Sequence, residues 1–165
     1  GVINIVTGKG SVIGNEMAGS PKIDIVSVTG SVGAGESIMA AESKNITKVS
    51  LELGGKAPAI VMKDADLERA AQWIVDSRIG NNGQICNNAE RVYVQKEVKA
   101  AFTEILVKKM QAVKVGDPCA DESVDMGPLV EQRPLESVTE KVERAISQGA
   151  KLLCGGHRVG TKGYF

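Results

Sequence analysis

Apolar and polar positions alternate along the chain in short stretches that predict strands. Runs rich in Val and Ile, bounded by Gly, Pro, Asn, Asp or Ser, are typical of strands in a mixed fold. These runs lie at residues 2–6, 23–28, 48–53, 58–62, 91–95 and 151–154. The run at 58–62 is continuous and apolar, as expected for a buried strand of a parallel sheet.

Four segments between or after these strands predict helices. They cover about residues 31–44, 67–79, 98–113 and 131–148. Apolar positions recur at three and four residues within 67–79, which is the period of a helix face. Ser31 can cap the first helix, Asp64 or Asp66 can cap the second, and Gly149 can end the last. Strands that alternate with helices predict an α/β fold with largely parallel sheets.

Loops divide this pattern and indicate where one sheet ends and another begins. Residues 80–84 form a polar loop bounded by glycines, and residues 115–128 form a long loop. Gly54 and Gly55 interrupt the chain directly after a predicted strand. We expect the boundary between two sheets near residues 53–55.

Composition narrows the classes of protein that fit this pattern. The 165 residues suffice for one domain with a core or for pieces of two. Lys plus Arg and Asp plus Glu both number 20, so charge gives no reason to expect nucleic acid or an anionic membrane as partner. No stretch approaches the roughly 18 apolar residues of a membrane helix. The three cysteines are irregularly spaced, which fits reduced thiols in the cytoplasm better than disulfides.

The start of the chain carries no secretory signal, because Gly1 leads directly into the apolar run at 2–6. A sequence that begins at Gly without Met also indicates a piece of a longer protein.

Cys86 is a candidate nucleophile within the sequence Gly-Gln-Ile-Cys-Asn-Asn at residues 83–88. A nucleophilic thiol needs solvent access and neighbours that favour the thiolate, and backbone N–H groups at a loop-to-helix junction would supply both that field and an oxyanion site. The alternative is a small buried apolar side chain, as most free cysteines are.

The usual partner of a catalytic cysteine is a histidine, and the chain contains only His157. His157 lies near the end of the chain, within Cys-Gly-Gly-His at residues 154–157, and has the character of a solvent-facing loop residue. Cys154 and His157 could form half of a zinc site, but Cys119 is isolated and the other half is missing. We therefore expect no metal and no Cys–His hydrolase.

Glu52 is a candidate general base, because it is a carboxylate at the end of an apolar strand. Burial is costly for an unpaired carboxylate and would suit it to accept a proton near neutral pH. The glycines that follow would let another backbone or a flat cofactor approach closely. The alternative is an edge-strand Glu that faces water.

A third candidate site is the glycine-rich turn at residues 29–35, Thr-Gly-Ser-Val-Gly-Ala-Gly. It follows a predicted strand and opens a predicted helix, which is the usual context of a phosphate site. Its glycine spacing matches neither G-x-G-x-x-G nor a P-loop, so an ordinary tight turn remains an alternative.

Taken together, these motifs resemble the aldehyde dehydrogenase superfamily. The most specific pair is Leu-Glu-Leu-Gly-Gly-Lys at residues 51–56 followed by Gly-Gln-Ile-Cys at 83–86. Weaker matching segments lie at residues 1–6, 28–31, 91–94, 116–118, 127–129, 149–151 and 163–165. The amino-acid sequence of residues 45–95 is most similar to that of the bacterial lactaldehyde and glycolaldehyde dehydrogenase branch.

The resemblance implies an NAD(P)-dependent oxidation of an aldehyde to a carboxylic acid. Cys86 would attack the aldehyde carbon, its backbone N–H and an Asn upstream of residue 1 would hold the oxyanion, and loss of hydride to the cofactor would leave a thioester. Glu52 would then activate water. Gly30, Ser31, Leu53 and Gly54 would contact NAD or NADP, with NAD favoured, and a small hydroxyaldehyde such as lactaldehyde would be the substrate.

The resemblance also implies an organisation into parts of two Rossmann-like parallel-sheet domains. Residues 1–53 would be the C-terminal part of the cofactor domain and residues 54–165 the N-terminal part of the catalytic domain. The chain would be about a third of a full-length enzyme and inactive by itself. Its parent would be a cytoplasmic homodimer or homotetramer.

Two other functions within the same fold remain open at this point. A non-catalytic relative would have no need of Cys86 or Glu52. A branch that transfers the acyl group to CoA or phosphate generally lacks a deacylating Glu, so Glu52 favours water as the acceptor.

Overall fold

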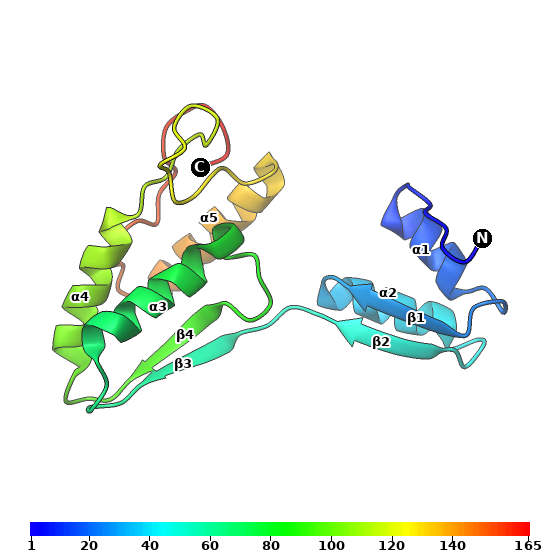
Figure 1. The fold of residues 1–165 in the computed structure, drawn as a ribbon, viewed down its shortest axis with the longest axis horizontal. Helices are drawn as coiled ribbons and strands as arrows, with labels where there is room; N and C mark the ends of the chain where they lie inside the picture. The colour runs from blue at the N-terminus through cyan, green and yellow to red at the C-terminus, as the bar shows by residue number, and fades with distance from the viewer. The chain divides into compact units, whose positions relative to one another are not determined.

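The computed structural model describes all of residues 1–165, and the chain divides into two compact units. Unit 1 comprises Gly1–Gly55 and unit 2 comprises Lys56–Phe165. Each unit contains one pair of parallel strands with helices packed beside it, as Figure 1 shows. The α/β class and the parallel pairing predicted from the sequence are confirmed.

Unit 1 is built from two strands and two helices. In chain order they are α1 (Gly10–Ala18), β1 (Ile25–Thr29), α2 (Val32–Glu42) and β2 (Lys48–Glu52). The predicted cap of α2 is confirmed, because the Ser31 side chain accepts a hydrogen bond from the Ala34 amide at 3.2 Å. The buried Ile38 of α2 and Ala18 of α1 form the core of this unit.

Unit 2 contains the second strand pair and most of the buried apolar side chains. Its elements are β3 (Ala57–Val61), α3 (Leu67–Ile79), the short 3₁₀ helix η1 (Gly80–Gly83), β4 (Ala89–Val94), α4 (Lys99–Ala112) and α5 (Gln132–Ser147). Of the two caps that the sequence offered for α3, Asp66 is the one used, since it accepts from the Arg69 amide at 3.1 Å. Val61, Ala71 and Phe102 form the centre of the core between β3, α3 and α4.

One face of the β3–β4 pair is covered and the other is open. Helices α3 and α4 lie along the covered face (Figure 1), where Val61 is buried. Ile60 points to the opposite face, and its side chain is 70% exposed. Tyr93, which lies opposite Ile60 in the strand register, is also exposed. The expectation that residues 58–62 are buried throughout is therefore wrong for this chain, because no element covers that second face.

Two strand predictions fail at the ends of the chain, and one observed helix was not predicted. Residues 2–6 and 151–154 are not strands. A strand needs a neighbour that completes its hydrogen bonds, and each observed strand pairs with only one other. The sequence also gave no sign of α1, because that helix begins at a glycine and Lys9 provides no side-chain cap.

Glu42, the last residue of α2, is buried without a partner. It is 1% exposed, and neither carboxylate oxygen accepts a hydrogen bond. A negative charge at a helix C-terminus also opposes the helix dipole. We expect Glu42→Met to raise the stability of the full-length parent by about 1–3 kcal/mol, the usual cost of burying an unsatisfied polar group.

Thermal or urea unfolding of the parent measures this effect. Glu36→Met is the matched control, because Glu36 lies on the same helix but is exposed. A midpoint that falls in Glu42→Met and not in the control would show that Glu42 is paired in the parent.

Candidate active site

The predicted cofactor residues meet at one edge of the sheet in unit 1. Strands β1 and β2 are parallel and Thr29 lies opposite Glu52, so both strands end at the same level. The Gly30 amide donates to the Glu52 carbonyl at 2.9 Å, which joins the two chain segments just past the strands. Ligands of open α/β sheets bind outside the carboxyl ends of strands. The residues placed there are Gly30, Ser31, Glu52, Leu53 and Gly54.

The start of α2 is open and suited to an anionic group. The first amides of a helix have no partner within the helix, and they attract phosphate. An ideal Cβ on Gly33 would meet no atom within 4 Å, so the space beside this turn is free. The turn therefore fits the pyrophosphate of a dinucleotide. Gly30 and Ser31 are both exposed there.

Gly35 has a different role from the other glycines of this turn. A Cβ at Gly35 would lie 3.0 Å from Leu53 Cδ2 and 3.4 Å from Leu51 Cδ1. This close approach lets α2 pack directly on the chain that carries Glu52. Gly35 thus shapes the edge through packing and has no need to touch a ligand.

The Glu52 side chain is exposed in this structure. Of the two interpretations left open by the sequence, the structure shows the water-facing one, because residues of β2 alternate between covered and open faces and Glu52 falls on the open one. The side chain makes no ion pair and accepts no hydrogen bond, so it is free to contact a ligand or water.

Cys86 lies on an exposed loop in unit 2, between η1 and β4. Its side chain is solvent-accessible and forms no disulfide, which excludes the alternative of a buried apolar cysteine. The expected loop-to-helix junction is absent, since β4 follows the loop. The loop instead turns tightly through Asn81 and Asn82, both with left-handed backbone angles, and Gly83 with φ +76°. We call residues 80–88 the Cys86 loop.

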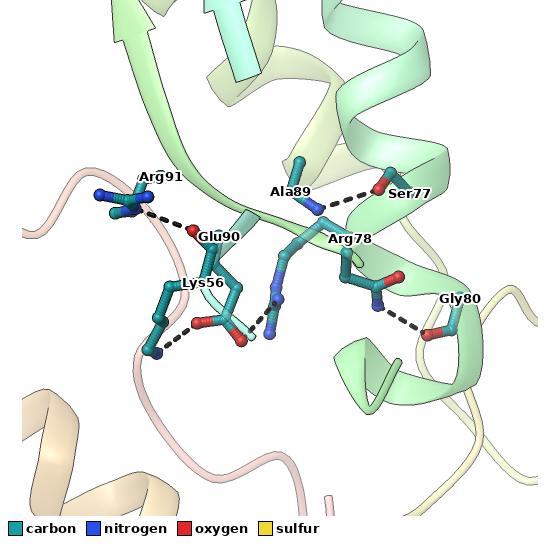
Figure 2. A network of polar contacts seen from close by, with 8 residues as sticks. Lys56, Ser77, Arg78, Gly80, Ala89, Glu90 and Arg91 are labelled. Atoms are coloured by element: carbon teal, nitrogen blue, oxygen red, sulfur yellow. Dashed lines mark hydrogen bonds and ion pairs between the residues drawn. The ribbon is translucent and has the colours of Figure 1, made fainter. Parts of the chain in front are cut away.

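The two ends of the Cys86 loop are held together by polar contacts, which Figure 2 shows. The Ala89 amide donates to Ser77 Oγ at 3.0 Å. Asn88 is 3% exposed, and its Nδ2 donates to the Gly80 carbonyl at 3.2 Å. The loop is thereby closed at its base, and the Cys86 side chain within it is exposed.

A charged network adjoins this base. Glu90 forms ion pairs with Lys56 and with Arg78, whose Nη1 lies 3.4 Å from Glu90 Oε1 (Figure 2). Arg91 Nε donates to the Lys56 carbonyl at 2.9 Å. The hydrogen bond from Lys56, with a smaller contribution from Arg78, holds the pKa of Glu90 below its ordinary value. Glu90 is therefore ionised at neutral pH and remains paired.

Asn82 ties the Cys86 loop to the long loop that precedes α5. Its Nδ2 donates to the Pro128 carbonyl at 2.9 Å. Asn82 also borders an apolar groove of about 330 Å³ whose walls come from α5, the loop before it and the C-terminal tail. Cys86 does not line this groove.

The remaining thiols and the histidine form no second site. Cys119 is exposed, Cys154 is half-buried, and His157 is exposed with its Nδ1 3.1 Å from the Gly155 carbonyl. No cluster of His, Cys, Asp and Glu side chains has an arrangement suited to a metal ion. No helix combines the length and apolar character needed to cross a bilayer.

Sequence reasoning did not single out Ser77, Arg78, Asn88 or Glu90. These residues lie next to the Cys86 motif, but their contacts depend on how α3 and β4 are brought together. The one available signal was the charged pair Glu90 and Arg91 at the start of a strand that ends in apolar and aromatic residues.

Known proteins resemble this chain in sequence over its whole length. The Aldehyde dehydrogenase family profile matches residues 1–165. Lactaldehyde dehydrogenase of Escherichia coli (strain K12) is 56% identical over 165 residues, which is 100% of this chain and 34% of that protein. The 3,6-anhydro-alpha-L-galactose dehydrogenase of Vibrio sp. (strain EJY3) is 46% identical, again over 100% of this chain and 34% of the relative. The chain thus spans about a third of the length of the curated relatives it matches.

Solved structures agree with this result. A structure of lactaldehyde dehydrogenase from Escherichia coli matches with a TM-score of 0.94 and 56% identity, covering 97% of this chain and 34% of that one. A betaine aldehyde dehydrogenase from Staphylococcus aureus, solved in complex with NAD⁺, matches with a TM-score of 0.89 and 32% identity, covering 94% and 30%. From the profile match, the sequence identities and the shared fold, the chain belongs to the aldehyde dehydrogenase family.

Proposed function

We propose that the full-length parent of this chain oxidises an aldehyde to a carboxylic acid with NAD(P), through a covalent adduct on Cys86. The observation that carries the proposal is an exposed thiol on a loop closed at its base, in a chain that the family profile matches throughout. A thiol in that setting is accessible to a small carbonyl compound and is held in a defined place.

The cofactor fits the edge of unit 1. Gly30 and Ser31, with the free amides at the start of α2, would hold the pyrophosphate, and Leu53 and Gly54 would lie beside the nicotinamide. The cofactor supplies the hydride acceptor when bound. We assign residues 1–53 to the C-terminal part of the cofactor domain and residues 54–165 to the N-terminal part of the catalytic domain; the compact units divide slightly later, after Gly55.

Cys86 performs the first covalent step in this proposal. Its thiolate adds to the aldehyde carbon, the C–S bond forms, and the carbonyl π electrons move to oxygen. The Cys86 amide makes no hydrogen bond within the chain, so it can donate to that oxyanion. Departure of hydride from the same carbon leaves a thioester on Cys86.

Glu52 performs the second step. Its free carboxylate takes a proton from water, and the resulting hydroxide adds to the thioester carbon. The C–S bond breaks, the acid leaves, and the Cys86 thiolate is restored.

The substrate that we favour is a small hydroxyaldehyde such as lactaldehyde. Support comes from the relatives named for lactaldehyde and for an anhydrosugar aldehyde, both polar and oxygen-rich. We further propose a cytoplasmic homodimer or homotetramer, since all three cysteines are free thiols as in a reducing compartment.

Steady-state assays of the full-length parent test this function. We expect lactaldehyde and glycolaldehyde to support reduction of NAD, and of NADP less well, with release of the free acid. Propanal is the control that lacks the hydroxyl group. A requirement for CoA or phosphate, with an acyl thioester or acyl phosphate as product, would assign the parent to the acyl-transferring branch. The absence of any aldehyde-dependent reduction would reject the proposal.

A further inference from the structure

The Arg78 side chain lies directly against the Cys86 loop. An ideal Cβ on Gly83 would clash with Arg78 Nη2, would lie 2.9 Å from Arg78 Cζ and would lie 3.2 Å from the Arg78 carbonyl. Gly83 is thus the position at which the guanidinium contacts the loop, three residues before Cys86. The Arg78 side chain is 36% exposed overall, but it packs closely against the turn at Gly83, so displacement of the guanidinium would change the support of this turn.

Glu90 is the carboxylate paired with this guanidinium: Arg78 Nη1 lies 3.4 Å from Glu90 Oε1, as an ion pair without hydrogen-bond geometry. Its side chain is 22% exposed, and one carboxylate oxygen faces Arg78 while the other faces Lys56 (Figure 2). The backbone carbonyl of Lys56 in turn accepts a hydrogen bond from Arg91 Nε. The carboxylate therefore connects β3, the end of α3 and β4 at the point where the loop leaves them.

The other contacts at the base do not duplicate this role. The Ser77–Ala89 and Asn88–Gly80 hydrogen bonds join the two ends of the loop; the second reaches Gly80 at the start of η1, and neither contacts Gly83. The pair formed by Glu90 and Arg78 is the part of the network that reaches toward Cys86.

We propose that Glu90 is a positioning residue for Cys86, which it orients by keeping the Arg78 guanidinium packed under Gly83. The inference rests on the proposed nucleophilic role of Cys86. It assigns Glu90 no contact with substrate or cofactor. Loss of the carboxylate would let the guanidinium and the turn move, and a shift of about 1 Å at a nucleophile can slow the reaction by up to ~10²-fold.

The test compares Glu90→Gln, Arg78→Met and Glu90→Asp in the full-length parent. The readouts are kcat, the rate at which iodoacetamide alkylates Cys86 as mapped by mass spectrometry, the Kd for NAD, and the thermal midpoint. We expect Glu90→Gln and Arg78→Met to lower kcat and alkylation about tenfold, with Kd for NAD unchanged. Glu90→Asp retains the charge and should recover part of the loss.

Two features of the design separate positioning from general stability. Glu68→Gln removes a carboxylate in the first turn of α3 that is paired with Lys109 at 3.2 Å and is more exposed than that of Glu90, and it should leave kcat at the parent value. The Glu90→Gln/Arg78→Met double variant should be no slower than either single variant, because both act through one contact.

The proposal is overturned if folded Glu90→Gln alkylates and turns over like Glu68→Gln. If Glu90→Gln does not fold, Arg78→Met decides, since it leaves the Lys56–Glu90 pair intact: unchanged alkylation overturns the proposal and slowed alkylation supports it. Failure of the underlying function gives a different signature, namely a Cys86→Ala variant that retains activity.

Discussion

Replacing Cys86 with alanine in the full-length parent is expected to abolish aldehyde-dependent reduction of NAD(P). Removal of a covalent nucleophile typically lowers kcat by roughly 10⁴-fold or more, because no other group forms the intermediate. Binding of NAD, followed by fluorescence or calorimetry, should be retained, since the proposed cofactor residues belong to unit 1 and Cys86 to unit 2.

Cys119→Ala is the matched control for this variant. Cys119 is also an exposed free thiol of unit 2, but it lies outside the Cys86 loop. The control should retain parental kcat and the alkylation of Cys86. Full dehydrogenase activity in Cys86→Ala would contradict the central assignment, and the proposed mechanism would have to be abandoned.

Replacing Glu52 with glutamine is expected to block the second half of the reaction and spare the first. The amide cannot take a proton from water, so the thioester should accumulate on Cys86. Rapid mixing of enzyme, NAD and aldehyde should give a burst of reduced cofactor close to one equivalent per site. Steady-state turnover should then be slower than in the parent by about 10²–10⁴-fold, the usual contribution of a positioned general base.

Hydroxylamine and mass spectrometry extend this test. An added nucleophile that needs no general base should restore turnover, and the acylated Cys86 peptide should be found without it. Glu36→Gln, an exposed Glu of the same unit, is expected to behave as the parent does. A variant with neither burst nor adduct would mean that Glu52 acts before the thioester forms.

Local signals were sufficient for the elements that carry them. Helix α3 was predicted with its observed bounds, because a capping Asp and a regular apolar face coincide within Leu67–Ile79. The start of α2 followed in the same way from Ser31. These helices are specified by contacts between residues that are close in sequence.

Elements that depend on distant partners were predicted less well. Residues 151–154 have the composition of a strand, yet strand formation requires an adjacent backbone that this chain does not provide. Leu152 and Leu153 are each 49% exposed as a result. Helix α1 lacks both a side-chain cap and charged residues that complement its ends, so composition gave no reason to expect it.

The same distinction between local signals and distant contacts applies to the residues of the candidate site. Cys86 and Glu52 were selected from motifs that are contiguous in sequence, and their catalytic roles stay predictions. Arg78 and Glu90 could not be identified at that level, because their pairing exists only once the end of α3 and the start of β4 are brought together. Motifs identified the reacting groups, whereas tertiary structure was needed to find what supports them.

The hydrogen bond from the Gly30 amide to the Glu52 carbonyl has a consequence for protein engineering. This hydrogen bond joins the turn proposed to bind the dinucleotide to the residue proposed to activate water for hydrolysis of the thioester. Redesign of residues 30–33 to change how tightly the dinucleotide is bound would therefore disturb hydrolysis of the acyl enzyme as well. Variants selected only for tighter coenzyme binding should be screened for product release, and second-site changes near Gly35 and Leu53 are the places to restore it.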